Sequence, residues 1–264
     1  MKIHIFLIAT FSFIFFSLPL LSLASTCVIA GDQAKISGLF VNGEEKSLGV
    51  IEDCKEVELR EGQIEVCYRD STHAKRCDPL ASGEKLVLDN PGDFFGRLTV
   101  AKFEQILTPS TSGLGGRRLD EDVSIPGFPS GEILLPVDKL VFSVEHSVLP
   151  QGLNLFSLYA DGNDANPIYE IGSQGGSIEI PAKKLESGKT YRWVARSSGG
   201  SYDDTFRTAN EEDQADFEKQ LTESIRETKG SPLAEGILKA ELCNEYEYFF
   251  DRDQALRKVF ASNH

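Results

Sequence analysis

The chain has 264 residues, and its 41 Asp and Glu outnumber its 27 Lys and Arg, which gives a formal net charge of −14. An acidic surface repels nucleic acid and anionic lipid, because binding to either depends on Lys and Arg that displace counterions. The composition therefore disfavours those two ligand classes and leaves ordinary solubility, a basic partner or a divalent cation as interpretations.

An apolar run at the amino terminus is typical of a secretory signal peptide. Residues 3–23 contain no Asp, Glu, Lys or Arg, and Ser22-Leu23-Ala24 ends the run with small residues. We predict that residues 1–24 are removed, so that the mature chain begins at Ser25 in the periplasm or outside the cell. An uncleaved anchor and lipoprotein processing at Cys27 are the alternatives.

Four of the five cysteines lie near the amino terminus, at Cys27, Cys54, Cys67 and Cys77. In an exported chain they predict two disulfides, and four cysteines allow three pairings. We favour Cys67–Cys77, because the residues on either side of 71–73 can face each other across a turn, which leaves Cys27–Cys54. A metal site is the alternative, although the sequence lacks a Cys-x-x-Cys. Cys243, far downstream in a helical pattern, is predicted to be a small core residue.

Residues 25–107 are predicted to form a small antiparallel β-module, and modules of this size often need disulfides for stability. Asn42-Gly43 is a strong hairpin signal after the strand-like stretch 35–41. Residues 56–59 and 64–68 alternate between polar and apolar side chains, as half-buried strands do. We expect short strands separated by turns up to the end of this segment.

Residues 108–131 are predicted to be a linker, because Gly, Pro, Ser, Thr and clustered charges dominate the segment. The Gly-rich stretch 113–116 lacks the spacing of a phosphate-binding loop. An extended strap that docks one domain on the other is the alternative.

Residues 132–208 are predicted to form an antiparallel sandwich, because six short strand-like runs are separated by Gly, Asn, Asp and Pro. The stretch Leu185-Glu-Ser-Gly-Lys-Thr-Tyr191-Arg-Trp193 resembles the turn and penultimate strand of fibronectin type III and related immunoglobulin-like domains. The resemblance implies that the Tyr191 hydroxyl binds the preceding loop. Tyr191, Trp193 and Ala195 alternate on one face, which predicts that they point into the core. The resemblance implies no particular function.

Residues 209–264 switch to helical spacing. Residues 208–211 fit a capping box, and residues 217–225 carry a narrow apolar stripe. We expect Gly230 to end this helix and Ser231-Pro232 to begin the next one.

Residues 233–262 resemble a single tetratricopeptide helix hairpin. The resemblance rests on Leu242-Cys243-x-x-Tyr246 and on Phe250-Asp-Arg-Asp-Gln-Ala255, where Phe250 replaces the Gly usual in that family. It implies two packed helices. Because an array needs roughly three repeats, we expect this pair to cap the sandwich, with docking to another protein as the alternative.

Catalytic and metal-binding motifs are weak in this sequence. His73, His146 and His264 accompany no G-x-S-x-G, H-E-x-x-H or S-x-x-K motif, which disfavours hydrolysis. The loop 161–166 offers four oxygen-bearing side chains for calcium, but it departs from an EF-hand loop, and its composition suits a hairpin turn.

Four aromatic residues crowd one end of the last helix pair, namely Tyr246, Tyr248, Phe249 and Phe250. One helix face cannot bury all of them, so we predict that some form a contact patch for a partner. They are the candidate partner-binding residues, and core packing is the alternative.

Together these features predict a mainly β fold with a C-terminal helical segment, without a cofactor or a bound metal. The function that they favour is a non-catalytic binding or scaffolding protein of the cell envelope, with an envelope protein as partner and no membrane span after signal cleavage. A carbohydrate- or calcium-binding module and a glycan hydrolase with paired carboxylates are the alternatives.

Overall fold

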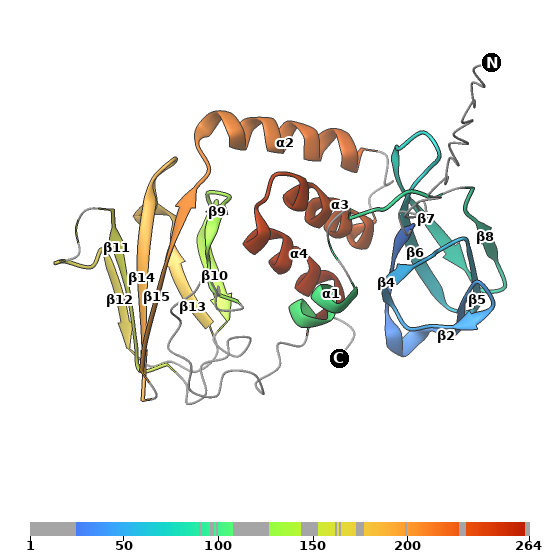
Figure 1. Ribbon diagram of the computed structural model, residues 1–264, viewed down its shortest axis with the longest axis horizontal. Helices are drawn as coiled ribbons and strands as arrows, with labels where there is room; N and C mark the ends of the chain where they lie inside the picture. Colours follow the sequence, from blue (N-terminus) through green and yellow to red (C-terminus); the bar gives the residue numbers. More distant parts are fainter. Residues whose placement is uncertain are drawn as a thin grey trace, which may run out of the picture.

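The computed structural model describes residues 25–89, 91–95, 98, 100–107, 127–143, 153–161, 163, 165–172, 177–198, 200–226 and 231–261. Two β-rich units lie at opposite ends of the molecule, with helices between them (Figure 1). The mainly β fold with C-terminal helices is confirmed. The predicted signal peptide, residues 1–24, and most of the predicted linker, residues 108–126, lie outside the described residues.

The N-terminal β-module consists of two four-stranded antiparallel sheets. The first sheet has the order β4 (Gly49–Glu52), β1 (Thr26–Gly31), β6 (Gln63–Arg69), β7 (Lys75–Ala81). The second has the order β3 (Glu44–Glu45), β2 (Ser37–Val41), β5 (Glu56–Glu61), β8 (Lys85–Val87), and a helical turn, η1 (Gln33–Lys35), connects β1 to β2. Alternate residues of both sheets, among them Ile29 and Leu59, share one core.

Both predicted disulfides are present in the β-module. Cys67 and Cys77 lie directly opposite each other in the β6–β7 hairpin, as the turn between them predicted. The other disulfide joins Cys27 of β1 to Cys54, in the loop between β4 and β5. Both crosslinks restrict the unfolded chain and so favour the folded β-module. Cys243 is a free thiol and is buried, as predicted.

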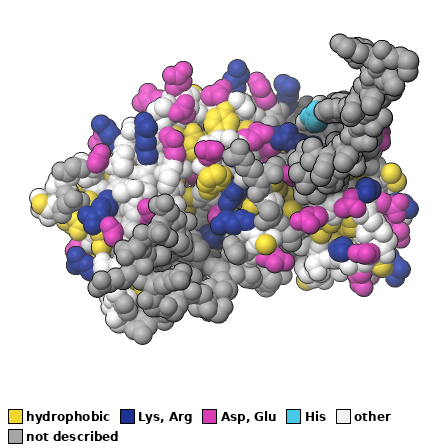
Figure 2. Space-filling model, viewed as in Figure 1, with side chains coloured by type: hydrophobic (Ala, Val, Ile, Leu, Met, Phe, Trp, Pro, Cys, Tyr) yellow, Lys and Arg dark blue, Asp and Glu magenta, His cyan; other side chains and the backbone are white. Residues whose placement is uncertain are grey.

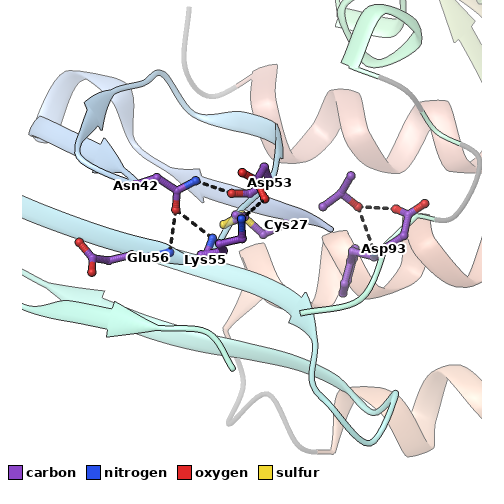
Figure 3. The surroundings of a disulfide bond; sticks show 9 residues. Cys27, Asn42, Asp53, Lys55, Glu56 and Asp93 are labelled. Carbon is purple, nitrogen blue, oxygen red and sulfur yellow. Dashed lines mark hydrogen bonds and ion pairs between the residues drawn. A yellow bond between two sulfur atoms is a disulfide. The ribbon is translucent and has the colours of Figure 1, made fainter. Parts of the chain in front are cut away.

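The hairpin predicted at Asn42-Gly43 joins β2 to β3. These two residues have φ values of 52° and 82°, as a tight primed turn requires. The Asn42 side chain also holds the neighbouring loop (Figure 3): its Oδ1 accepts from the N–H groups of Lys55 and Glu56, each at 3.0 Å, and its Nδ2 donates to Asp53 O. One side chain therefore fixes the loop that carries Cys54.

We expect Asn42→Ala to destabilise the protein by about 2–3 kcal/mol, because it removes three hydrogen bonds and places an unsuited residue in left-handed backbone. Urea unfolding of the chain 25–264 measures this loss. Asn42→Gly is the matched control, since it keeps the backbone conformation and loses only the hydrogen bonds. A larger loss for Gly than for Ala would contradict the role given to the backbone.

The end of the β-module is helical, and the prediction of strands up to residue 107 is wrong there. Helix α1 (Val100–Leu107) buries Phe103 and Ile106, which lie three residues apart on one helix face. The prediction failed because a helix of about two turns shows its apolar spacing only once.

The second β unit is sandwich-like. Its five-stranded sheet has the order β12 (Tyr169–Gly172), β11 (Leu155–Ala160), β14 (Thr190–Ser197), β15 (Gly200–Thr208), β9 (Gly131–Ile133). The second sheet pairs β10 (Lys139–Ser143) with β13 (Ser177–Pro181), which a helical turn, η2 (Ala182–Lys184), follows. Pairs between the described strands are antiparallel, except that β9 runs parallel to β15. The two sheets share one core.

The hydrogen bond that the fibronectin type III resemblance implies is present. The N–H of Glu186 donates to the hydroxyl of Tyr191 at 2.6 Å and closes the turn before β14. Trp193 is fully buried, and its Nε1 donates to Pro129 O at 2.8 Å. The Phe128 ring centroid lies 4.8 Å from that of Trp193. The last residues of the predicted linker therefore pack in the core of this unit.

Three helices follow the sandwich, namely α2 (Glu211–Ile225), α3 (Pro232–Glu245) and α4 (Phe249–Ala261). The predicted start of α3 is confirmed: Ser231 is the N-cap and Pro232 is the first helical residue. Gly230, the predicted end of α2, lies outside the described residues. α3 and α4 approach each other closely at Gly236. A β-carbon at that position would collide with Val259 of α4.

The capping box predicted at residues 208–211 is wrong by two positions. Asn210 caps α2, and its Oδ1 accepts from the N–H of Asp213 at 2.9 Å. Thr208 is not free to cap the helix, because its hydroxyl donates to Glu186 O inside the sandwich. Thr208 and Asn210 both suit an N-cap, and the contact of Thr208 with the sandwich leaves Asn210 to cap α2.

The C-terminal helices complete the core of the N-terminal β-module. One cluster of buried side chains joins Val28, Val50 and Phe94 of the β-module to α1, α3 and α4. Among the described residues, the sandwich core includes only Phe250 from these helices. The expectation that the helical segment caps the sandwich is therefore corrected, since most of its apolar surface packs on the β-module.

Candidate functional site

We call α3 and α4 the helical hub, because they lie between the two β units and contact both (Figure 1). On the β-module side, α3 presents Glu241, whose side chain is 1% exposed. Nη2 of Arg69, at the end of β6, lies 2.6 Å from a carboxylate oxygen of Glu241 and 2.8 Å from one of Glu245. Nζ of Lys75, at the start of β7, pairs with both carboxylates as well. We call these four residues the ion cluster.

The two carboxylates of the ion cluster lie in different environments. Burial raises the pKa of Glu241 to about 7, against the lowering effect of Lys75 and Arg69. Partial burial acts in the same direction on Glu245, but hydrogen bonds from the two cations outweigh it and lower the pKa of that carboxyl. Carboxylates with separated pKa values are typical of acid–base catalysts. Here Arg69 and Lys75 pair with both carboxylates, and Glu241 lacks access to solvent. The arrangement therefore suits a structural contact.

A second set of hydrogen bonds ties the helical hub to the chain around α1. Nδ2 of Asn244 donates to Phe95 O at 2.8 Å, and Nη1 of Arg252 donates to Asn244 Oδ1 at 2.9 Å. Nε of Arg257 donates to Ile106 O, at the end of α1, at 3.0 Å. Separating the hub from this segment would leave Asn244 Nδ2 and Arg257 Nε without these partners, which adds to the cost of exposing the apolar core.

On the sandwich side, two adjacent residues of α4 make the contact. Asp251 accepts a hydrogen bond from the N–H of Leu134, just after β9, at 2.9 Å. Burial raises the pKa of Asp251 to about 6, and the bond from Leu134 offsets part of that rise. The neighbouring Phe250 packs in the sandwich core. The helical hub therefore has a carboxylate with a raised pKa on each of its two sides, of which Glu241 is fully buried and Asp251 is half-buried.

The predicted partner-binding aromatics do not share one surface. Tyr248 and Phe250 are 3% and 7% exposed, so their side chains belong to the interior. Tyr246 is half-buried, and its ring centroid lies 5.5 Å from that of Phe217 on α2. Phe249 is 45% exposed. Of the predicted set, only Phe249 is therefore open to a partner without a change in structure.

The described surface is mixed and mostly polar. Charged side chains of both signs cover the face drawn in Figure 2, and hydrophobic side chains gather near its middle. The exposed large hydrophobic residues in the described part of the chain are Val87, Val137, Val141 and Phe249. None of the helices described is long and apolar enough to cross a membrane.

The predicted histidines do not come together in the described structure. His73 lies in the turn between β6 and β7, where its φ of 65° is left-handed. His146 and His264 lie outside the described residues. A role for any of them in hydrolysis therefore stays without structural support.

The predicted calcium loop forms part of the connection between β11 and β12. The N–H of Asp161 donates to Thr190 O and that of Asn163 to Ala160 O, each at 3.1 Å, as turn residues do. Positions 162 and 164 lie outside the described residues. Within the described ranges, no group of three or more His, Cys, Asp or Glu is arranged to hold a metal ion.

Sequence reasoning missed the ion cluster entirely. Glu241 and Glu245 share one face of α3 at i, i+4 spacing, and Arg69 and Lys75 face each other two residues beyond the Cys67–Cys77 disulfide. Two acids at i, i+4 spacing are common on solvated helices, so the spacing of Glu241 and Glu245 did not indicate a buried contact. Only the packing of α3 on the hairpin brings the four charges together.

Comparisons with known proteins do not place this chain in a family. No protein-family model matches it, and no curated protein matches it. Among solved structures, a chain described as "Biofilm associated protein - BSP domain" is similar at 10% identity with a TM-score of 0.24, over 71% of this chain and 25% of that chain. This chain thus spans a quarter of that structure's length, and a likeness at this level says nothing about function.

Proposed function

We propose that this chain is an exported, non-catalytic binding or scaffolding protein of the cell envelope, in which the helical hub holds two β units at a fixed spacing. The observation that carries the proposal is the double engagement of the hub. The ion cluster and a shared apolar core hold the β-module, while Asp251 and Phe250 hold the sandwich. The large apolar interface keeps the β-module from moving freely against the hub, and Asp251 and Phe250 attach the sandwich to the same hub, so a partner on one unit is held at a set distance from the other.

Two further features support this proposal. The disulfides Cys27–Cys54 and Cys67–Cys77 fit an oxidising compartment, where such bonds persist. The pair of carboxylates with separated pKa values, Glu241 and Glu245, is engaged by cations, which favours a structural role over a catalytic one.

Phe249 is our candidate for the contact with a partner. The Arg252 guanidinium carbon lies 4.9 Å from the centre of its ring, and Arg252 itself is buried, so the exposed ring is held in place. Val137, which is 89% exposed, lies three residues after Leu134, whose N–H binds Asp251. Aromatic residues and Arg are enriched in protein interfaces.

We expect Phe249→Asp to reduce capture of the partner at least tenfold in affinity capture from native envelope extract, since it puts a charge into an apolar contact. The bait is the chain 25–264. Val87→Asp is the matched control, because Val87 is 67% exposed on β8, away from the hub. Equal capture by both variants would move the contact elsewhere, and no specific partner with any of the three proteins would contradict a binding role.

A further inference from the structure

Helix α2 is attached to the rest of the protein by a narrow face. Of its fifteen residues only Phe217 is fully buried, and six are Asp or Glu. Leu221, one turn further along, is partly buried in the same cluster. A helix that is polar almost all round gains little from packing and commonly bridges other elements through solvent. In Figure 1, α2 lies along the outside of the molecule, over the helical hub.

Phe217 occupies a slot lined by aromatic side chains of the helical hub. Its ring centroid lies 5.5 Å from that of Tyr246 and 5.7 Å from that of Tyr248, both with edge-on geometry. Leu242 and Cys243 of α3 complete the apolar lining, in a cluster separate from the cores of the two β units. We call this lining the aromatic slot. Two of the residues predicted to bind a partner therefore line a site that α2 fills.

Polar contacts around the aromatic slot select the orientation of its occupant. The Tyr246 hydroxyl donates to Asp216 and accepts from Nε2 of Gln220. It therefore binds one polar side chain before Phe217 and one after it. At the other edge, Oε1 of Gln214 accepts from the N–H of Leu135 at 2.9 Å, and its Nε2 donates to Leu135 O at 3.2 Å. The slot thus recognises a helix that carries Asp-Phe-x-x-Gln-Leu, as residues 216–221 do.

We propose that α2 is a displaceable lid and that the aromatic slot binds, in its place, an acidic amphipathic helix of a partner protein with Phe and Leu four residues apart. The chemistry of the partner follows from the occupant that the slot holds in this structure. Docking of a helix through such anchors is a recurring mode of recognition. This site is separate from Phe249, so the inference does not depend on the contact proposed above.

The arrangement sets α2 in competition with the partner helix. A tethered helix has an effective concentration in the millimolar range, so a free helix of equal intrinsic affinity binds poorly while α2 is docked. Loosening α2 should therefore reveal binding that the intact chain hides. Phe217→Ala removes the ring that fills the aromatic slot. Gln214→Ala removes the hydrogen bonds to Leu135, together with one to Glu218 within α2, and leaves the Phe217 ring in place.

The probe is a fluorescein-labelled peptide with the sequence of residues 209–226, followed by fluorescence anisotropy against the chain 25–264 at about 0.15 M salt, where repulsion between acidic molecules is screened. We expect the Phe217→Ala chain to bind the peptide at least tenfold more tightly than the wild-type chain does, and the Gln214→Ala chain to show a smaller gain. The same peptide with Ala in place of its Phe should not bind either variant.

Three outcomes would overturn the proposal. The first is that both variants stay folded, by far-UV circular dichroism and Trp193 fluorescence, and neither binds the peptide more tightly than wild type. The second is that the peptide with Ala for Phe binds as well as the original. The third is that the wild-type chain is a dimer by light scattering and the two α2 helices exchange between copies, which would make a second copy the occupant. If Phe217→Ala unfolds the protein, the test rests on the Gln214→Ala chain: tighter binding of the peptide than by wild type supports the proposal, and unchanged binding overturns it.

Discussion

A chain that ends at Arg226 will keep a folded sandwich and lose its folded N-terminal β-module. The removed helices supply one side of the core that contains Val28, Val50 and Phe94, and they carry both acids of the ion cluster. From the sandwich core the truncation removes only Phe250 among the described residues. Loss of a whole layer exposes apolar surface far beyond the stability margin of a small domain. The unit that unfolds is thus the one furthest in sequence from the cut.

Hydrogen exchange read by mass spectrometry measures this result, because it reports the two units separately. In the truncated chain, peptides from β1 and β6 should exchange at the rate of an unfolded chain, and peptides from β14 and β15 should stay protected. Trp193 fluorescence provides an independent check on the sandwich. Protection of β1 and β6 that survives the truncation would show that the β-module and its two disulfides are sufficient for folding.

A single substitution gives a graded version of the same experiment. Leu256 of α4 is fully buried in the core shared with the β-module, so Leu256→Ala should cost about 2–5 kcal/mol of unfolding free energy. Val87→Ala is the comparison, since Val87 is 67% exposed on β8 of the same module and should change stability by less than about 0.5 kcal/mol. Similar effects of the two substitutions would mean that the hub contributes little to the β-module.

Local signals in the sequence were enough wherever the interacting residues are neighbours in the chain. Asn42-Gly43 forms its turn, Cys67 and Cys77 meet across a hairpin, and the hydroxyl of Tyr191 binds a residue five positions earlier. In each case the local turn geometry is enough to bring the partners together. The same reasoning failed for α1, because so short a helix takes its stability from the hub that it packs on.

The candidate site could not be predicted, because its contacts join residues far apart in the sequence. Glu241 pairs with cations of the β6–β7 hairpin, more than 160 positions away by its numbering. Nothing near Glu241 in the sequence distinguishes it from the solvated acids of α2. For the aromatic residues of the tail, crowding alone could not tell which would stay exposed: the protein buries Tyr248 and Phe250 on different sides of the hub and leaves Phe249 exposed.

Raising the pH from about 4 to 7 will weaken the contacts on both sides of the hub, because carboxylates whose pKa values are raised must ionise there. Burial raises the pKa of Asp251 to about 6 and that of Glu241 to about 7. In the unfolded chain both groups titrate at about 4. Below that pH both states hold these protons and the stabilising difference is fully present. As the pH rises, the unfolded chain releases them first, so the free energy of unfolding falls until the folded protein has ionised as well.

The neighbouring Glu245 acts with the opposite sign in a different pH range. Its pKa is lowered, so its contribution is present above the unfolded value of about 4.3 and is lost only as the pH falls through the folded pKa. Between about pH 5 and 7 the decline therefore comes from Glu241 and Asp251, together with Asp253 of α4, whose pKa burial also raises against the lowering effect of Arg252. For Asp251, the raised pKa of about 6 corresponds to about 3 kcal/mol of stability lost over the whole pH range.

Asp251→Asn tests this account, because the amide keeps an oxygen that can accept from the N–H of Leu134 and cannot ionise. In urea unfolding from pH 4 to 8, the variant should lose about 2 kcal/mol less than wild type between pH 4 and 6. Glu212→Gln, on the exposed face of α2, controls for net charge and should keep the wild-type profile. An unchanged profile for Asp251→Asn would exclude the sandwich side as the origin. Since Glu241 faces the β-module, Glu241→Gln then separates the two sides of the hub.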